Sequence, residues 1–166
     1  MTDREQTCCF TGHRSTKLPW GGNENDPRCL ELRKKIAEAV LDAYDSGIRR
    51  FICGMAIGCD TYFAEAVIAL REEKPDVRLE AAVPCERQDQ GWGEARSNRY
   101  DRLLASCDCV TLLGKEYTRD CMQRRNEYMV DHSSVIIAVF NGKPGGTLNT
   151  LRYAVQKGLK ICEIEP

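Results

Sequence analysis

Short runs of apolar residues alternate along the chain with longer segments in which apolar residues recur every three or four positions. The short runs are typical of buried strands, and the longer spacing is typical of helices with one buried face. Six strands are predicted, at residues 7–11, 50–53, 77–83, 109–113, 135–140 and 160–164. Five helices are predicted between them, at residues 27–47, 60–74, 97–106, 120–132 and 147–157.

Capping and breaking residues support several of these boundaries. Asp26 is a suitable N-cap for the first helix, and Pro27 suits its first turn. Pro75 ends the second helix, because proline cannot donate the hydrogen bond that a helix interior needs. Gly158 is the expected C-terminal cap of the last helix.

Strict alternation of strands and helices predicts a mostly parallel sheet with helices on both faces, since right-handed crossovers join parallel strands. At 166 residues the chain lies in the usual size range of one domain. We therefore expect a single Rossmann-like three-layer α/β sandwich over residues 1–166. With the strands numbered along the chain, the expected order is 3-2-1-4-5-6.

Three polar loops each follow a predicted strand, at residues 11–14, 54–60 and 141–147. In a parallel sheet the carboxyl ends of the strands meet at one rim, and ligands bind there, where the strand order reverses. Glycines far apart in the sequence are therefore expected to lie close together in space.

The loop from Gly54 to Asp60 has the features of a phosphate cradle. Gly54 and Gly58 follow a strand and open a helix, where missing Cβ atoms let backbone amides approach a phosphate at the positive helix end. The loop is neither a Walker motif nor Gly-x-Gly-x-x-Gly. Short turns between strands and helices also favour glycine for structural reasons, so both interpretations stay open for this loop alone.

A second glycine pair, Gly145–Gly146, stands before Thr147 at the start of the last helix. Thr147 is placed as an N-cap whose hydroxyl also suits contact with an anion. Two such loops on one rim favour a bound ligand over a purely structural role.

Basic residues near these loops supply charge for an anion. Arg14 suits a bidentate phosphate contact, and His13 suits contact with a base or proton transfer, although a solvated surface pair is the alternative. Arg124 and Arg125 lie in the first turns of the fourth helix, where positive charge opposes the helix dipole. A bound anion or a carboxylate would account for one of these two arginines, and the other is expected in solvent.

Asp60 and Glu65 are the carboxylates nearest the first glycine loop, and with His13 they are the candidate catalytic residues. Five residues apart, the two carboxylates do not share one helix face, which argues against a paired-carboxylate glycosidase. Asp60 also suits helix capping. No Ser-His-Asp or Cys-His-Asp triad is indicated, because nothing local selects among the serines and cysteines.

Composition narrows the classes of partner. The 24 basic and 25 acidic residues nearly cancel, which argues against a general attraction to nucleic acid or to an anionic membrane. No apolar stretch approaches the ~20 residues that span a bilayer, and the first residues lack the apolar region of a signal peptide. A cytoplasmic location is therefore expected, and a homo-oligomer stays open.

The ten cysteines are expected to be reduced thiols. Disulfide scaffolds are short and loop-rich, and most of these cysteines fall within apolar strand patterns, where a thiol behaves as a small hydrophobe. Cys8–Cys9 and the pair Cys107 and Cys109 lack the paired spacing of a zinc site, so no metal is expected.

Four motifs together resemble the SLOG superfamily, the Rossmannoid group that includes the DNA-processing protein DprA and the LOG phosphoribohydrolases. The motifs are Thr11-Gly-His-Arg14, Gly54-Met-Ala-Ile-Gly58-Cys-Asp60 with Ala64-Glu65, Arg125-Asn126-x-x-Met129-Val-Asp131, and Gly145-Gly146-Thr147. They are most similar to the YpsA-like branch, over nearly the whole chain. The resemblance implies a nucleotide-like ligand between the loop after the second strand and the loop before the last helix.

Two departures bear on function. LOG enzymes carry Pro-Gly-Gly-x-Gly-Thr-x-x-Glu, and Thr150 stands here where that glutamate would be, which argues against the phosphoribohydrolase reaction. DprA binds single-stranded DNA, but this chain has no net positive charge and few aromatic residues for base stacking.

The leading prediction is a sensor-like or weakly enzymatic protein that binds a nucleotide or a nucleotide-derived ligand bearing phosphate, with NAD and ADP-ribose-like molecules among the candidates. One alternative is a hydrolase that cleaves an N-glycosidic or phosphate bond, and the other is DprA-like binding of single-stranded DNA. The predicted ligand-binding residues are Thr11, Gly12, His13, Arg14, Gly54, Met55, Gly58, Asp60, Arg125, Asn126, Gly145, Gly146 and Thr147.

Overall fold

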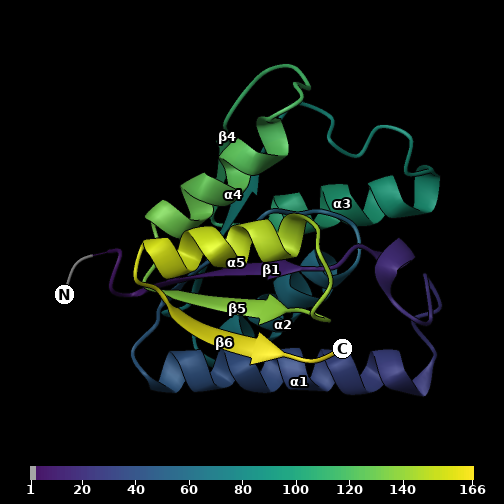
Figure 1. Ribbon diagram of the computed structural model, residues 1–166. Coiled ribbons are helices and arrows are strands. Elements are labelled where there is room, and N and C mark those ends of the chain that lie inside the picture. Colours follow the sequence, from purple (N-terminus) through teal and green to yellow (C-terminus); the bar gives the residue numbers. More distant parts are fainter. Residues whose placement is uncertain (1–2) are drawn as a thin grey trace.

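A computed structural model describes residues 3–166 and contains a six-stranded sheet (Figure 1). The strands are β1 (Thr7–Gly12), β2 (Arg50–Cys53), β3 (Arg78–Val83), β4 (Cys109–Leu112), β5 (Val135–Val139) and β6 (Lys160–Ile164). The helices are α1 (Pro27–Asp45), α2 (Cys59–Glu73), α3 (Glu94–Ser106), α4 (Cys121–Asp131) and α5 (Gly146–Gln156), with a short 3-10 helix, η1 (Ser15–Lys17). All neighbouring strands pair in parallel, so the predicted Rossmann-like α/β class is confirmed.

The strand order is β4-β3-β2-β1-β5-β6, and the predicted order 3-2-1-4-5-6 is wrong in the position of the fourth strand. β4 lies at the edge of the sheet beside β3, and its residues Val110 and Leu112 are about half exposed. β5 pairs with β1 instead, and its residues 136–139 are fully buried. A strand flanked on both sides and covered on both faces must be apolar throughout, which suits β5 and not β4.

Helices cover both faces of this sheet, as Figure 1 shows for α1 below and α5 above. α1, α2 and α3 pack against one face, which presents Phe10, Phe51 and Leu79. α4 and α5 pack against the other face, which presents Ile52 and Ile136. The sheet is therefore the middle layer of three, and its faces form two separate cores.

Most predicted element boundaries agree with the structure to within about two residues, and α3 differs most. This helix was expected to begin at residue 97, but it begins at Glu94, directly after Gly93. Gly93 has a φ of 88°, which ends the preceding turn, and the acidic side chain of Glu94 suits the positive end of a helix. At α1 the predicted N-cap is present, since the carboxylate of Asp26 accepts a hydrogen bond from the Arg28 amide at 2.9 Å.

The ten cysteines are free thiols, and seven of them are buried. Within residues 3–166, no group of three or more His, Cys, Asp or Glu side chains is arranged to hold a metal ion. In the same part of the chain, no helix is both long enough and apolar enough to cross a membrane.

Candidate functional site

A cavity of about 150 Å³ lies beside the carboxyl ends of β1 and β5, where the strand order reverses. Open parallel sheets bind their ligands at this position. In Figure 1 the arrowheads of β1, β5 and β6 point to this side of the molecule, and η1 follows β1 there. The cavity is lined by Phe10, Thr11, Gly12, His13, Arg14, Lys17, Ala56, Asp60, Met122, Arg125, Asn126, Met129, Gly146 and Thr147.

The cavity brings together many of the residues predicted to bind a ligand. These are Thr11, Gly12, His13, Arg14, Asp60, Arg125, Asn126, Gly146 and Thr147. Gly54, Met55, Gly58 and Gly145 are not in its lining. Met55 and Gly58 instead line a smaller pocket of about 50 Å³ that also contains Trp92 and Tyr100.

Arg125 is a buried cation in the wall of the cavity. Only 5% of its surface is exposed. Its Nη1 donates to the Gly54 carbonyl at 2.5 Å, and its Nε donates to Oδ1 of Asn126 at 2.8 Å. Both acceptors are neutral, so these bonds hold the guanidinium in place without cancelling its charge. Burial lowers the pKa of Arg125, and the charge of Asp60 opposes that shift.

Gly54 makes room for this arginine. A Cβ atom at position 54 would lie 2.7 Å from the guanidinium carbon of Arg125, closer than real contacts allow. Gly54, the first glycine of the predicted phosphate cradle, therefore leaves the space that the Arg125 side chain occupies. Nothing in the sequence around Gly54 indicates a partner 71 residues away.

Gly58 joins the loop after β2 to the loop after β1. Its φ of 98° lies in the region that favours glycine, and an added Cβ would lie 2.6 Å from the Ser15 amide nitrogen. The next residue, Cys59, donates its amide to the His13 carbonyl at 3.2 Å. This glycine therefore permits close approach between two segments of backbone, which positions the His13 and Arg14 side of the cavity.

His13 joins the loops that follow β1 and β5. Its Nε2 accepts a hydrogen bond from the Asn141 amide at 3.1 Å, so that nitrogen carries no proton. Burial lowers the pKa of His13, and the nearby charge of Lys17 lowers it further. The imidazole is thus held neutral, and its Nε2 is occupied by a structural bond.

Asp60 is the carboxylate of the cavity. It is 7% exposed, and its Oδ2 accepts a hydrogen bond from the Ala56 amide at 2.9 Å. Burial raises the pKa of Asp60, while Arg125, the Ala56 amide and Arg14 all lower it. Asp60 therefore orders the loop before α2 and remains accessible from the cavity.

The N-terminus of α5 contributes positive potential to the same space. Gly146 and Thr147, its first two residues, line the cavity. No side chain caps this helix end, and no acidic residue lies in its first turn. The first amides of a helix have no partner within the helix, so this end is suited to an anion.

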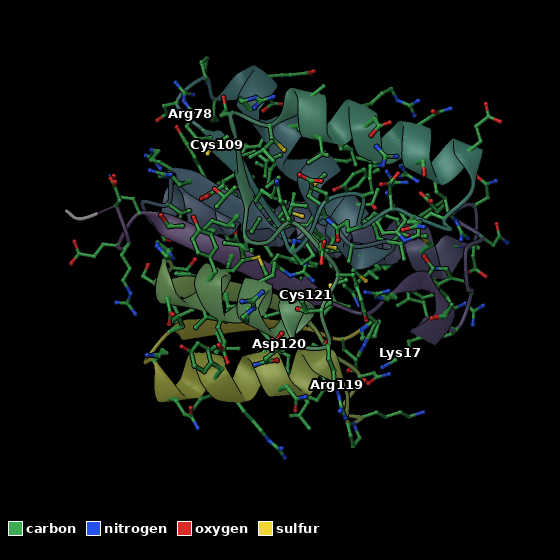
Figure 2. The ribbon with its side chains drawn as sticks, turned by 90° about the horizontal axis from the view of Figure 1, so that it is seen from above. Lys17, Arg78, Cys109, Arg119, Asp120 and Cys121 are labelled. Carbon is green, nitrogen blue, oxygen red and sulfur yellow. The ribbon has the colours of Figure 1, made fainter. Side chains whose placement is uncertain are left out.

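Lys17 is a cavity residue that the motifs did not indicate. It lies on η1, and its Nζ would be 2.9 Å from a Cβ atom at Gly145, which places the ammonium against the turn before α5. In Figure 2, Lys17 lies toward the end of the molecule where Arg119 and Asp120 precede α4, away from Arg78 and Cys109. The spacing of three between Arg14 and Lys17 is the signal that could have predicted it.

The charges of the cavity do not balance. Arg14, Lys17 and Arg125 are cationic, and Asp60 is the carboxylate among the lining residues. Within residues 3–166, none of these three cations forms an ion pair with a carboxylate. Arg124 differs from its neighbour, because its half-exposed side chain lies 3.7 Å from Asp120, outside the cavity.

Two other residues considered in the sequence lie apart from this charge cluster. Glu65 pairs with Arg33 at 2.8 Å and with Arg99 at 2.7 Å, so this candidate base is neutralised away from the cavity. Thr150 is buried, and its hydroxyl donates to the Gly146 carbonyl at 2.9 Å. The position that holds a glutamate in LOG enzymes is therefore a structural threonine here.

Similar proteins cover nearly the whole chain. A family model described as the YspA SLOG family matches residues 8–162. The prophage-derived protein YoqJ of Bacillus subtilis (strain 168) is 31% identical over 142 residues, covering 78% of this chain and 83% of that protein. A UPF0398 protein of Bacillus thuringiensis (strain Al Hakam) is 28% identical over 159 residues, covering 93% of this chain and 83% of that protein.

A solved structure, the X-ray structure of TM1055, has a similar fold. Its TM-score is 0.59 at 15% identity, and the match covers 94% of this chain and 72% of that one. Identity this low bears on the fold alone, and it agrees with the parallel α/β sheet described above. The family model, which runs from β1 to β6, and the 31% identity to YoqJ show that the chain belongs to the YspA SLOG family.

Proposed function

We propose that this protein binds a nucleotide or a nucleotide-derived molecule through its phosphate group, in the cavity beside β1 and β5. The observation that carries the proposal is Arg125, a guanidinium that is 5% exposed, lines the cavity and has only neutral hydrogen-bond partners. An unpaired buried charge is costly, and an anionic ligand would offset that cost.

The surroundings of Arg125 support an anion of more than one charge. Arg14 and Lys17 add two cations at the cavity, and the uncapped start of α5 adds the partial charge of a helix end. Asp60 offsets one of these charges at most. A phosphate ester, with up to two negative charges and several acceptor oxygens, matches this arrangement.

The size of the cavity supports a small ligand that extends into solvent. The volume of the cavity is about 150 Å³. That space suits a phosphate group with part of a sugar. Membership of the SLOG family and a Rossmann-like sheet are consistent with a nucleotide-related ligand.

A thermal-shift screen would identify the ligand, because a molecule that binds only the folded state raises its stability. The screen should contain mononucleotides, NAD, ADP-ribose and cyclic dinucleotides. We expect at least one of them to raise the melting temperature. If none does and calorimetry also detects no binding, the proposal is wrong.

The paired variants Arg125→Ala and Arg124→Ala test the residue that carries the proposal. Arg125→Ala should weaken binding by roughly 1.5–3 kcal/mol, the usual contribution of a hydrogen bond to a charged group. Arg124→Ala changes an adjacent, exposed arginine outside the cavity and should leave the affinity within about twofold of wild type. Isothermal titration calorimetry measures both, and circular dichroism checks that each variant is folded. Equal effects in the two variants would show that Arg125 is not the anion contact.

A hydrolytic activity is the second candidate, because Asp60 is a carboxylate in the same cavity and burial raises its pKa toward the range of a general acid or base. Thr150 does not supply the second carboxylate expected of a LOG enzyme. Incubation of the protein with each nucleotide that binds, followed by chromatography, would show whether free base or phosphate is released.

A further inference from the structure

Asp60 presents one carboxylate oxygen to a cavity that is otherwise cationic. Its Oδ2 is occupied by the Ala56 amide at 2.9 Å. Its Oδ1 has no hydrogen-bond partner among residues 3–166, and it is not among the fully buried atoms left unpaired, which are Trp20 Nε1, Gln88 Oε1 and Asp89 Oδ1. Since Asp60 also lines the cavity, Oδ1 is the atom that a ligand there can reach.

A carboxylate oxygen does not suit contact with a phosphate. An ionised carboxylate only accepts hydrogen bonds, and so do the oxygens of a phosphate dianion, so the two repel when they are close. A ligand group that contacts Oδ1 of the ionised carboxylate must therefore be a donor. A hydroxyl on the carbon skeleton that carries the phosphate is the simplest donor that enters the cavity with the anion.

We infer that the ligand is a phosphate ester of a hydroxylated sugar, and that Asp60 selects it by accepting a hydrogen bond from a sugar hydroxyl while Arg14, Lys17 and Arg125 hold the phosphate. This inference rests on the proposed function and specifies its ligand class. It makes Asp60 a specificity residue that discriminates sugar phosphates from free phosphate and from esters without hydroxyl groups.

The test compares three probes, AMP, dideoxy-AMP without either ribose hydroxyl, and inorganic phosphate, by calorimetry on wild type and Asp60→Asn. Wild type should bind AMP about tenfold or more tightly than dideoxy-AMP, because hydrogen bonds to charged groups are the strong ones. In Asp60→Asn, this ratio should fall to about threefold or less, the range of a neutral hydrogen bond. The affinity for inorganic phosphate should stay equal or rise, because a negative charge has been removed near the anion.

A lower AMP to dideoxy-AMP ratio together with an equal or higher phosphate affinity would show that Asp60 determines specificity and does not merely support the structure of the cavity. A variant that merely disordered the loop would lose phosphate affinity as well, and that result would overturn the inference. An unchanged AMP to dideoxy-AMP ratio would also overturn it, whatever happens to phosphate. If phosphate and AMP bind wild type but show no dependence on Asp60, the proposed function stands and only this inference fails. If neither AMP nor inorganic phosphate binds wild type, this inference fails, and the thermal-shift screen decides whether the proposed function stands.

Glu65→Gln is the matched control. Glu65 is a carboxylate on the same helix, α2, but it pairs with Arg33 and Arg99 and does not line the cavity. Its substitution should leave the AMP to dideoxy-AMP ratio and the phosphate affinity as in wild type. A change in the ratio as large as that of Asp60→Asn would mean that the effect is not specific to the cavity, and the inference would be wrong.

Discussion

At the scale of single residues, the site depends on bonds between side chains and distant backbone groups. Arg125 is held by the carbonyl of Gly54, and His13 by the amide of Asn141. The first bond links α4 to the loop after β2, and the second links the loop after β1 to the loop after β5. Arg125 and His13 also line the cavity, so a substitution of either residue affects both folding and ligand binding. Stability and binding must therefore be measured separately.

The pH dependence of stability tests the bond made by His13. Burial lowers the pKa of His13 in the folded protein, below the value of about 6.5 expected in the unfolded chain. As the pH falls through about 6.5, the unfolded state takes up the proton first, so stability is lost on the acid side. Wild type should therefore lose more unfolding free energy than His13→Gln when the pH falls from about 7.5 to about 5.5.

Glutamine is the appropriate replacement for His13, because its side-chain carbonyl accepts a hydrogen bond from the Asn141 amide and does not titrate. Urea denaturation at several pH values gives the two slopes, and their difference isolates His13 from other groups such as Asp60. Identical slopes would show that His13 is equally protonated in the folded and unfolded states.

At the scale of elements, the turns between strands and helices contribute mainly by holding other segments of the site in place. The loop before α2 packs against the loop after β1 through Gly58, and Gly54 leaves space for a side chain of α4. The start of α5 differs, because Gly146 has open space around the position of a Cβ atom. Glycine is therefore required for packing at α2 and is compatible with an approaching ligand at α5.

Substitution of these glycines by alanine distinguishes the two roles. Gly58→Ala combines a left-handed φ of 98° with a contact of 2.6 Å to backbone, so it should lower the free energy of unfolding. The expected loss is about 2 kcal/mol or more. Gly146→Ala meets no atom within 4 Å and should change stability by less than about 0.5 kcal/mol. Urea denaturation compares the two, and equal losses would contradict the structural role of Gly58.

At the scale of the whole molecule, the net charge is small, but positive charge is concentrated at the cavity. The chain carries a formal net charge of −1, yet three cations and one carboxylate meet at one cavity. A small anion needs only such a cluster, whereas a single-stranded nucleic acid needs a positive groove along several nucleotides and aromatic faces for stacking. The charge distribution therefore favours a small ligand over DNA.

A binding measurement on an oligonucleotide checks this prediction. We expect no measurable binding of a single strand of about twenty nucleotides at physiological salt, because too few phosphates would be neutralised to hold it. A small phosphate ester should still bind under the same conditions. Fluorescence anisotropy with a labelled strand measures the first and calorimetry the second. Tight, salt-sensitive binding of the strand that is lost in Arg125→Ala would favour the DprA-like alternative.

The sequence by itself determined the class of the fold, the positions of the elements and the rim that carries the site. Hydrophobic periodicity is local, so it identifies strands and helices directly, and their alternation leaves few arrangements other than a parallel sheet. Gly145–Gly146 and the motif that begins at Thr11 were found in the same way, because turns and helix starts favour particular residues within a short window.

Only the tertiary structure decided which of these residues meet. The position of β4 at the edge depends on competition among all six strands for the centre of the sheet, which the pattern of one strand does not settle by itself. Adjacent arginines in one helix look alike in the sequence, but the helix turns Arg125 into the cavity and Arg124 toward Asp120. Burial and charge pairing arise between segments distant in sequence, and they separate Asp60, which lines the cavity, from Glu65, which two arginines neutralise elsewhere.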